Sequence, residues 1–230
     1  MKKEIKLNVD ENKTIVLFVD SQSENQDIVE MIKKGARDSF VYFDNIKKIR
    51  FGVELIYSRK EFDKKIGYKT ESWVTAHSFG SSFIIFSPLG MEKYTSHNRN
   101  EFIQIITHET SHIMLKKLNT DFCTWMNEGI AQNIAGQKQK ARIDSKNTNY
   151  FLKESLFKNS NYEKFISRQG YEISYKLVRF LMTKYDKETI IRLLQVKYDF
   201  TDSSRGNICK ILDTDSDKLI DQFKKVLENV

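Results

Sequence analysis

The stretch that decides the fold is residues 98–131, which read NRNEFIQIITHETSHIMLKKLNTDFCTWMNEGIA. Asn98 and Glu101 form a capping-box pair, a pattern that opens many helices. Hydrophobic residues then recur at helical spacing, which predicts a helix from about 99 to 117. A short loop over 118–123 leads to a second predicted helix from about 124 to 136. Because the loop is short, the second helix can return antiparallel across the first.

The first of these helices carries His108-Glu109-Thr110-Ser111-His112. Residues four apart lie on one face of a helix, roughly 6 Å from each other. Two imidazoles placed in this way can hold one zinc ion, each through one ring nitrogen. Glu109 follows His108 directly, so its carboxylate can reach a water on the metal without occupying the metal. We therefore expect His108 and His112 to be metal ligands and Glu109 to be a general base.

A third ligand is available at the start of the second helix, in the segment Trp125-Met126-Asn127-Glu128-Gly129-Ile130-Ala131. A catalytic zinc site uses three protein ligands and keeps a fourth position open for water. An antiparallel second helix would bring Glu128 toward the two histidines. The sequence therefore predicts a site in which His108, His112 and Glu128 bind one Zn²⁺ per chain.

This combination of motifs resembles the gluzincin zinc metallopeptidases. The pair of histidines with its glutamate, followed by Glu128, matches their HExxH signature and downstream ligand. Residues 125–131 are similar to the Trp-Leu-x-Glu-Gly-x-Ala block around that ligand. The resemblance implies a thermolysin-like α+β fold of two lobes, the upper with a mixed sheet and a long helix, the lower helical. It also implies a zinc peptidase that hydrolyses peptide bonds by glutamate-assisted attack of water.

Two departures from the family pattern affect what the resemblance implies. Some gluzincins carry an aspartate four residues after the ligand glutamate, and this chain has Gln132 there. Aminopeptidases of this type grip the substrate's amine with a Gly-x-Met-Glu-Asn segment, which residues 90–93 match poorly, and we expect a loop there. The sequence therefore favours an endopeptidase. The competing hypothesis is a catalytically silent zinc-site module that acts by binding proteins.

Further candidates lie outside the two central helices. The likeness to small gluzincins suggests Tyr171, or else Tyr175, as the donor that stabilises the oxyanion in the transition state. A tyrosine packed with its hydroxyl hydrogen-bonded is an equal alternative. Residues 82–87 are expected to form an edge strand that receives substrate, although an ordinary core strand fits the same pattern. His77 and His97 are expected to be surface or packing residues.

Strand patterns precede the central helices and helical patterns follow them. Alternation predicts strands at 3–8, 13–20, 49–57, 73–78 and 82–87. A helix beginning near Ser23 and Gln26 should run to about 47, and a short one should cover 59–66. Residues 148–230 are expected to be helical, with breaks near 159, 170, 186 and 202. We expect a single catalytic domain over 1–230, made of strands, long helix and sheet (1–97), zinc-site helices (98–136) and a helical lobe (137–230).

Composition narrows the class of protein. With 40% hydrophobic and 30% charged residues, the chain is typical of globular proteins. The net charge of +7 comes from scattered basic pairs, so we expect solvated helix faces, and no nucleic-acid or membrane partner beside the peptide substrate. Cys123 and Cys209 are expected in the core as reduced thiols, which suits the cytoplasm. No signal-peptide pattern is present, though secretion with a removed leader stays open.

Overall fold

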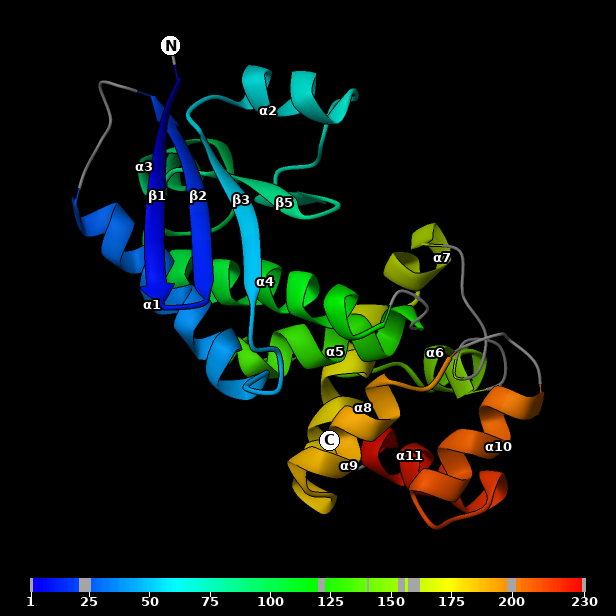
Figure 1. The fold of residues 1–230 in the computed structure, drawn as a ribbon. Helices are drawn as coiled ribbons and strands as arrows, with labels where there is room; N and C mark the ends of the chain where they lie inside the picture. Colours follow the sequence, from blue (N-terminus) through cyan, green and yellow to red (C-terminus); the bar gives the residue numbers. More distant parts are fainter. Residues whose placement is uncertain are drawn as a thin grey trace. The chain divides into compact units, whose positions relative to one another are not determined.

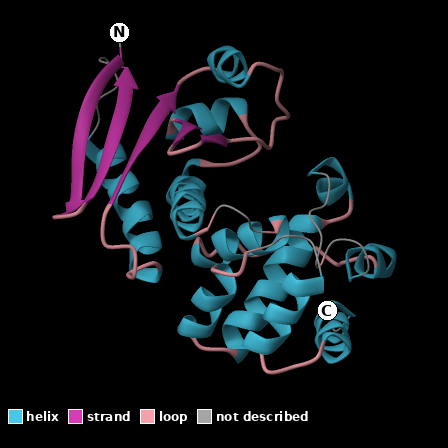
Figure 2. Cartoon of the chain, turned by 45° about the vertical axis from the view of Figure 1, so that its right-hand side comes forward, coloured by secondary structure: helices cyan, strands magenta, loops and turns pink. Residues whose placement is uncertain are grey.

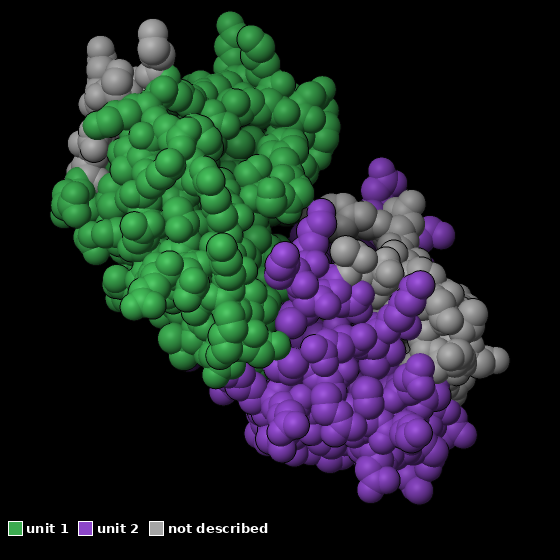
Figure 3. Space-filling view, in the orientation of Figure 1, with its two compact units in different colours: residues 1–114 green, residues 115–230 purple. Residues whose placement is uncertain are grey.

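The structure, a computed structural model, describes residues 2–20, 26–119, 123–139, 141–152, 156, 162–197 and 202–228. The chain divides into two compact units, residues 1–114 and 115–230, shown in green and purple in Figure 3. Among the described residues, the strands lie in the first unit and the second unit is helical (Figure 2). No helix among these residues has the length and apolar character needed to cross a membrane.

The first unit is built on a five-stranded mixed sheet, with the order β1-β2-β3-β5-β4 (Figure 1). Its strands are β1 (Lys2–Asp10), β2 (Lys13–Asp20), β3 (Ile49–Ile56), β4 (Ala76–Phe79) and β5 (Ser82–Phe86). The β1–β2 and β4–β5 pairs are antiparallel, whereas β2–β3 and β3–β5 are parallel. The predicted strands and the predicted mixed sheet are therefore confirmed, although β4 begins three residues later than its expected start at 73.

The prediction that residues 82–87 form an edge strand is wrong, because β5 lies between β3 and β4. At this end of the sheet the edge strand is β4. Gly80, whose φ is +62°, begins the turn that joins β4 to β5. Glycine adopts this backbone conformation without steric cost, as the first central residue of a tight hairpin turn. All residues of β5 after Ser82 are buried, as expected for a strand with neighbours on both sides.

Helices cover both faces of the sheet. On one face, Phe40 of α1 (Gln26–Tyr42) packs edge-on against Phe51 of β3, with ring centroids 6.2 Å apart. Phe51 in turn stacks with Phe83 of β5. On the other face, Phe62 of α2 (Arg59–Ile66) stacks on Phe86 of β5, with centroids 4.6 Å apart. Phe83 and Phe86 differ by an odd number of positions, so they point to opposite faces of the strand.

Two helix predictions in this unit need correction. Helix α1 ends at Tyr42 and not near 47, because Phe43-Asp44-Asn45 forms a turn in which Ile46 N–H donates to the Phe43 carbonyl; aspartate and asparagine favour turns over helix interiors. The expected start signal at Ser23 lies outside the described residues. Residues 90–93 form no loop but belong to α3 (Pro88–Tyr94), whose N-cap Ser87 accepts a hydrogen bond from Gly90 N–H.

The second unit is helical over most of its described residues, with the predicted breaks near 170 and 186, whereas the predicted break near 159 lies outside the described residues. Its elements after α5 (Thr124–Ile134) are α6 (Ser145–Tyr150), α7 (Tyr162–Ser167), α8 (Gly170–Lys184), α9 (Lys187–Leu194), α10 (Asp202–Ile211) and α11 (Ser216–Glu228). Trp125 anchors the core, because its indole N–H donates to the Leu156 carbonyl at 3.0 Å and its ring packs against Phe151 and Phe223. Cys123 and Cys209 are buried and are not joined in a disulfide, as expected.

Candidate metal centre

The histidine-bearing helix is α4 (Phe102–Leu118), preceded by a 3-10 turn over Arg99–Glu101. The predicted capping box is present: the Asn98 side chain accepts from the backbone, and the Glu101 carboxylate accepts from Asn98 N–H. Each bond satisfies a backbone donor that the first helical turn leaves without an intrahelical acceptor. The sequence signal thus located the start of this helix correctly.

Contacts with α1 determine which face of α4 is buried. Thr107 and Ser111 are buried, and the Ser39 hydroxyl of α1 lies 2.8 Å from the Thr107 carbonyl and 2.9 Å from Ser111 Oγ. Successive helical residues are rotated by about 100°. His108 and His112, each one position beyond a buried residue, are therefore turned away from α1, and both are half-buried.

Glu128 lies in α5 (Thr124–Ile134), in the second unit. The next residue, Gly129, explains how this helix is placed. A Cβ at Gly129 would lie 2.4 Å from both the Ser174 carbonyl oxygen and a methyl group of Val178, which are distances that real Cβ atoms do not show. Only glycine lets α5 approach the backbone of α8 this closely, beside the Glu128 position.

A side-chain amide adds a polar connection at the same crossing. Asn133 donates from Nδ2 to the Gly129 carbonyl at 2.8 Å and to the Tyr175 carbonyl at 3.0 Å. It therefore joins one turn of α5 to α8 through backbone acceptors on both helices. Trp125, Gly129 and Asn133 thus fix the position of α5 within the second unit, and Glu128 lies between the first two of these residues.

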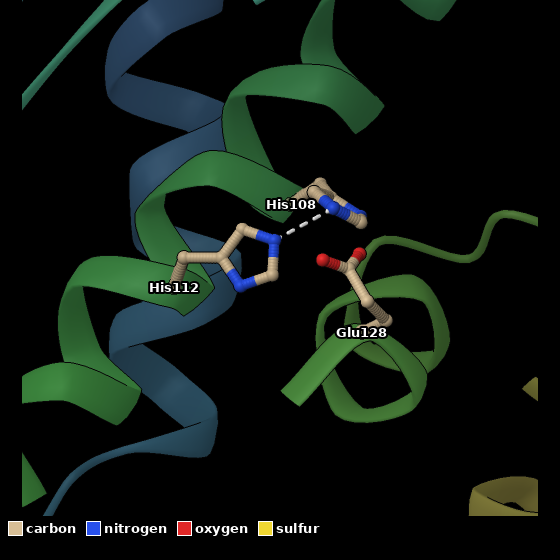
Figure 4. A group of neighbouring side chains, drawn as sticks. All are labelled: His108, His112 and Glu128. Carbon is tan, nitrogen blue, oxygen red and sulfur yellow. Dashed lines mark hydrogen bonds between the residues drawn. The ribbon is translucent and has the colours of Figure 1, made fainter. Parts of the chain in front are cut away.

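His108, His112 and Glu128 form one group, in which the candidate ligand atoms all lie within 4.8 Å of one another (Figure 4). The two histidines approach through their Nε2 atoms, which are 2.9 Å apart. A tetrahedral zinc ion with bonds of about 2.0–2.2 Å needs ligand atoms about 3.3–3.6 Å apart. The 2.9 Å between the two Nε2 atoms is shorter than this separation, and the 4.8 Å limit for the whole group is longer. Two imidazoles and a carboxylate are also a donor set that zinc accepts. The group therefore fits the predicted metal.

Glu109 is absent from this group and has another partner. Ser78 of the edge strand β4 donates from Oγ to Glu109 Oε2 at 2.7 Å. The base candidate thus lies next to His108 on the helix but is hydrogen-bonded to the sheet of its own unit. The sequence reasoning missed Ser78. A turn at Gly80-Ser81 can be recognised in the sequence, and it decides which side chains of the hairpin share a face. It does not show that α4 lies against the face that carries Ser78.

The two tyrosine candidates lie in the first turns of α8. Tyr171 is half-buried, and its ring packs edge-on against Phe165 of α7, with centroids 5.3 Å apart. Tyr175 is also half-buried, and its carbonyl accepts from Asn133. They flank Ser174, the residue that meets Gly129 beside Glu128. The position of α8 agrees with either candidate, and the role of Tyr171 stays a prediction.

Gln132, which stands where some gluzincins carry an aspartate, is buried, and its Oε1 has no hydrogen-bond partner among the described residues. His97 contacts Glu101 at 2.8 Å, and the His77 ring packs against Phe79. Within the part of the chain that the structure describes, the metal group contains neither of these histidines. Both contacts agree with the expected packing role.

No protein-family model and no curated protein matches this chain. Solved structures do match it. One is the M1 zinc metallopeptidase from Deinococcus radiodurans, with a TM-score of 0.52 and 10% sequence identity. Another is a point mutant of that enzyme, with a TM-score of 0.54 and 9% identity. Each match covers 99% of this chain and 52% of the other chain. The chain therefore spans about half the length of these structures and shares their fold over its own length.

Proposed function

We propose that this protein is a zinc-dependent endopeptidase. The observation that carries the proposal is the group of His108, His112 and Glu128, whose donor atoms lie within 4.8 Å, with Glu109 next to the first ligand on the same helix. Three protein donors leave one coordination position for substrate or water, as catalytic zinc sites require. The fold shared with M1 zinc metallopeptidases supports the proposal at the level of fold.

The chain's own residues have distinct roles in this reaction. Zinc held by the three ligands would polarise the scissile carbonyl and lower the pKa of the attacking water. Glu109 accepts the proton of that water and passes it to the leaving amine. Tyr171, or Tyr175 in reserve, donates a hydrogen bond to the oxygen that becomes negative in the transition state. Each role follows from the chemistry of the residue and its place on α4, α5 or α8.

The substrate is proposed to be a peptide that adds to the edge strand β4. An edge strand presents unpaired backbone donors and acceptors, which an extended peptide can satisfy. This assignment replaces the one first made for residues 82–87. A strand edge binds the backbone in the middle of a peptide and does not need a free end. Residues 90–93, at which a segment that binds the free amine was considered, are part of helix α3. Both points favour an endopeptidase.

The proposal extends to the whole chain. Residues 1–230 act as one catalytic domain with a thermolysin-like arrangement, and the partners are peptides or proteins, with neither nucleic acid nor membrane. The two buried cysteines, which are not joined in a disulfide, support a cytoplasmic location. A test of the endopeptidase assignment is a library of peptides with acetylated and amidated ends: cleavage within blocked peptides supports it, whereas cleavage that requires a free amine contradicts it.

The decisive test of the reaction is Glu109→Gln. The amide keeps the size of the side chain but removes the basic oxygen, so zinc content should stay at about one per chain while peptide cleavage falls by about 10²–10⁴-fold. Both are measured on zinc-loaded protein, by metal analysis and by mass spectrometry of a mixed peptide library. Glu92→Gln, in a glutamate of α3, is a matched control that should cleave normally.

Two results would contradict the proposal. If the zinc-loaded protein cleaves no peptide in a broad library, the chain is better explained as a zinc-site module that binds proteins. If Glu109→Gln cleaves as fast as the unaltered protein, the chemistry lies elsewhere. Folding of each variant is checked by circular dichroism, so that loss of cleavage is not mistaken for loss of structure.

A further inference from the structure

We propose that Ser78 is a positioning residue, which holds the Glu109 carboxylate in the orientation needed for proton transfer and connects it to the strand edge that receives the peptide. This inference rests on the proposed function, because Glu109 needs an orientation only if it is a base. It concerns a contact within the first unit alone: Ser78 Oγ donates to Glu109 Oε2 at 2.7 Å.

The register of the β4–β5 hairpin explains why Ser78 meets α4. Ser78 pairs directly with Phe83, and directly opposed residues point to the same face of a sheet. Phe83 stacks with Phe51, which packs against α1. Helix α4 packs on α1 through Ser39, so Ser78 is on the sheet face that α1 and α4 share. A shift of one residue would present His77 or Phe79 to Glu109 instead.

The backbone of Ser78 points to the outer edge of β4. Phe86 N–H donates to the Thr75 carbonyl at 3.1 Å, which makes Thr75 and Phe86 a hydrogen-bonded pair. Such pairs alternate along an antiparallel ladder. Ser78, three residues on, falls in a non-hydrogen-bonded pair, so its own N–H and carbonyl are directed away from β5. One residue therefore offers its backbone to a peptide on the edge and its hydroxyl to the base.

The hydroxyl occupies one oxygen of the carboxylate and leaves the other to take the proton. A hydrogen bond between a hydroxyl and a carboxylate is charge-assisted and directional, so it selects one rotamer of a flexible side chain. Ser78 is exposed and Glu109 half-buried, so solvent weakens the bond. The effect on the reaction should therefore be moderate. It should appear in kcat, because a misplaced base slows the chemical step more than it weakens substrate binding.

The kinetic test compares Ser78→Ala, Ser78→Thr and Ser82→Ala in zinc-loaded protein. Removing the hydroxyl should lower kcat by about 5–20-fold with KM changed by less than about two-fold. Threonine keeps the hydroxyl and suits a strand, so it should restore most of kcat. Ser82 is the control, because it lies in the same hairpin and its hydroxyl donates to the Phe79 carbonyl instead. In a Glu109→Gln background, Ser78→Ala should have no further effect, because there is no base left to orient.

A spectroscopic test does not depend on turnover. The side-chain carboxyl ¹³C resonance of Glu109 is identified by its absence in Glu109→Gln. It should shift in Ser78→Ala, return in Ser78→Thr and stay unchanged in Ser82→Ala. An unmoved resonance in Ser78→Ala, or a kcat equal to that of Ser82→Ala, would overturn the role of Ser78 in a protein that cleaves peptides. If the resonance moves but the unaltered protein cleaves nothing, the contact stands and the proposed function fails, and with it the positioning role.

Discussion

The helix that carries the two histidines and the helix that carries Glu128 are each secured within their units by a glycine and a polar bond, but their glycine contacts differ in closeness. Helix α4 meets α1 through hydroxyl groups, with Ser39 2.8 Å from the Thr107 carbonyl, and through the glycine at position 35. Helix α5 meets α8 at Gly129, where a Cβ would come within 2.4 Å of backbone. Both crossings thus combine a polar bond with a glycine that faces side chain and backbone of the neighbouring helix. They differ in closeness: an added Cβ would meet its nearest atom at 2.7 Å at Gly35 but at 2.4 Å at Gly129.

The difference has a physical consequence for substitution. At either glycine an added methyl group would press on a carbonyl of the neighbouring helix, which cannot move without displacing that helix, and the overlap is deeper at Gly129 than at Gly35. Within α4, Ser111 Oγ also donates to the Thr107 carbonyl, so both groups stay hydrogen-bonded when the Ser39 hydroxyl is removed. We therefore expect the histidine helix to tolerate change better than the Glu128 helix.

The largest effect is expected from the candidate ligands themselves. His112→Ala should reduce the zinc content from about one per chain to near zero, because two donors hold zinc poorly. Glu128→Gln should weaken zinc binding by about 10-fold or more, since a neutral amide is a poorer donor than a carboxylate. Metal analysis and chelator competition measure both. His97→Ala is the control histidine, and equal zinc affinity in Glu128→Gln and the unaltered protein would remove Glu128 from the site.

A direct comparison of the two helices comes from replacing their glycines. Gly129→Ala should destabilise the protein by about 3 kcal/mol or more, because the new methyl group collides with backbone. Gly35→Ala brings a Cβ within 2.7 Å of an Ile106 methyl group and 2.8 Å of the Ile103 carbonyl, and should cost about 1–2 kcal/mol after the gain in helix propensity. Urea unfolding followed by circular dichroism measures both. A Gly129→Ala variant as stable as Gly35→Ala would contradict the proposed difference.

The smallest effect is expected at Ser39. Ser39→Ala removes the hydroxyl beside Thr107 but leaves the Ser111 bond, so stability should fall by only about 1 kcal/mol. Ser167→Ala provides the comparison, because its exposed hydroxyl donates to the nearby Lys164 carbonyl and its loss should cost less than about 0.5 kcal/mol. A loss of several kcal/mol on Ser39→Ala would mean that polar bonds, and not the fit at Gly35, place α4.

Local signals explain why parts of the fold were predictable. The capping box at Asn98 and Glu101 marks the start of α4, and the spacing of His108 and His112 places both rings on one face. Helix α2 begins and ends where the sequence predicted, with Ser58 as N-cap and Gly67, at a φ of +94°, as C-cap. In each case the residues that decide the structure lie within a few positions of one another.

Other features depended on contacts between distant residues. The order of β4 and β5 was mistaken because β5 pairs in parallel with β3, far away in the sequence, and nothing within the hairpin shows which of its strands makes that pairing. The end of α1 was placed too late because Phe43 and Ile46, which continue the hydrophobic pattern, are buried in a turn.

The residue types of the candidate site could be recognised in the sequence alone: two imidazoles on a helix that a capping box opens, and a carboxylate on the helix that follows. The surroundings of these residues became visible only in the tertiary structure. It places Gly129 against the backbone of α8, makes β4 the edge strand and brings Ser78 within 2.7 Å of Glu109. The physical reason is range: helix spacing and capping act over a few residues, whereas strand order and helix crossings come from packing between segments distant in the sequence.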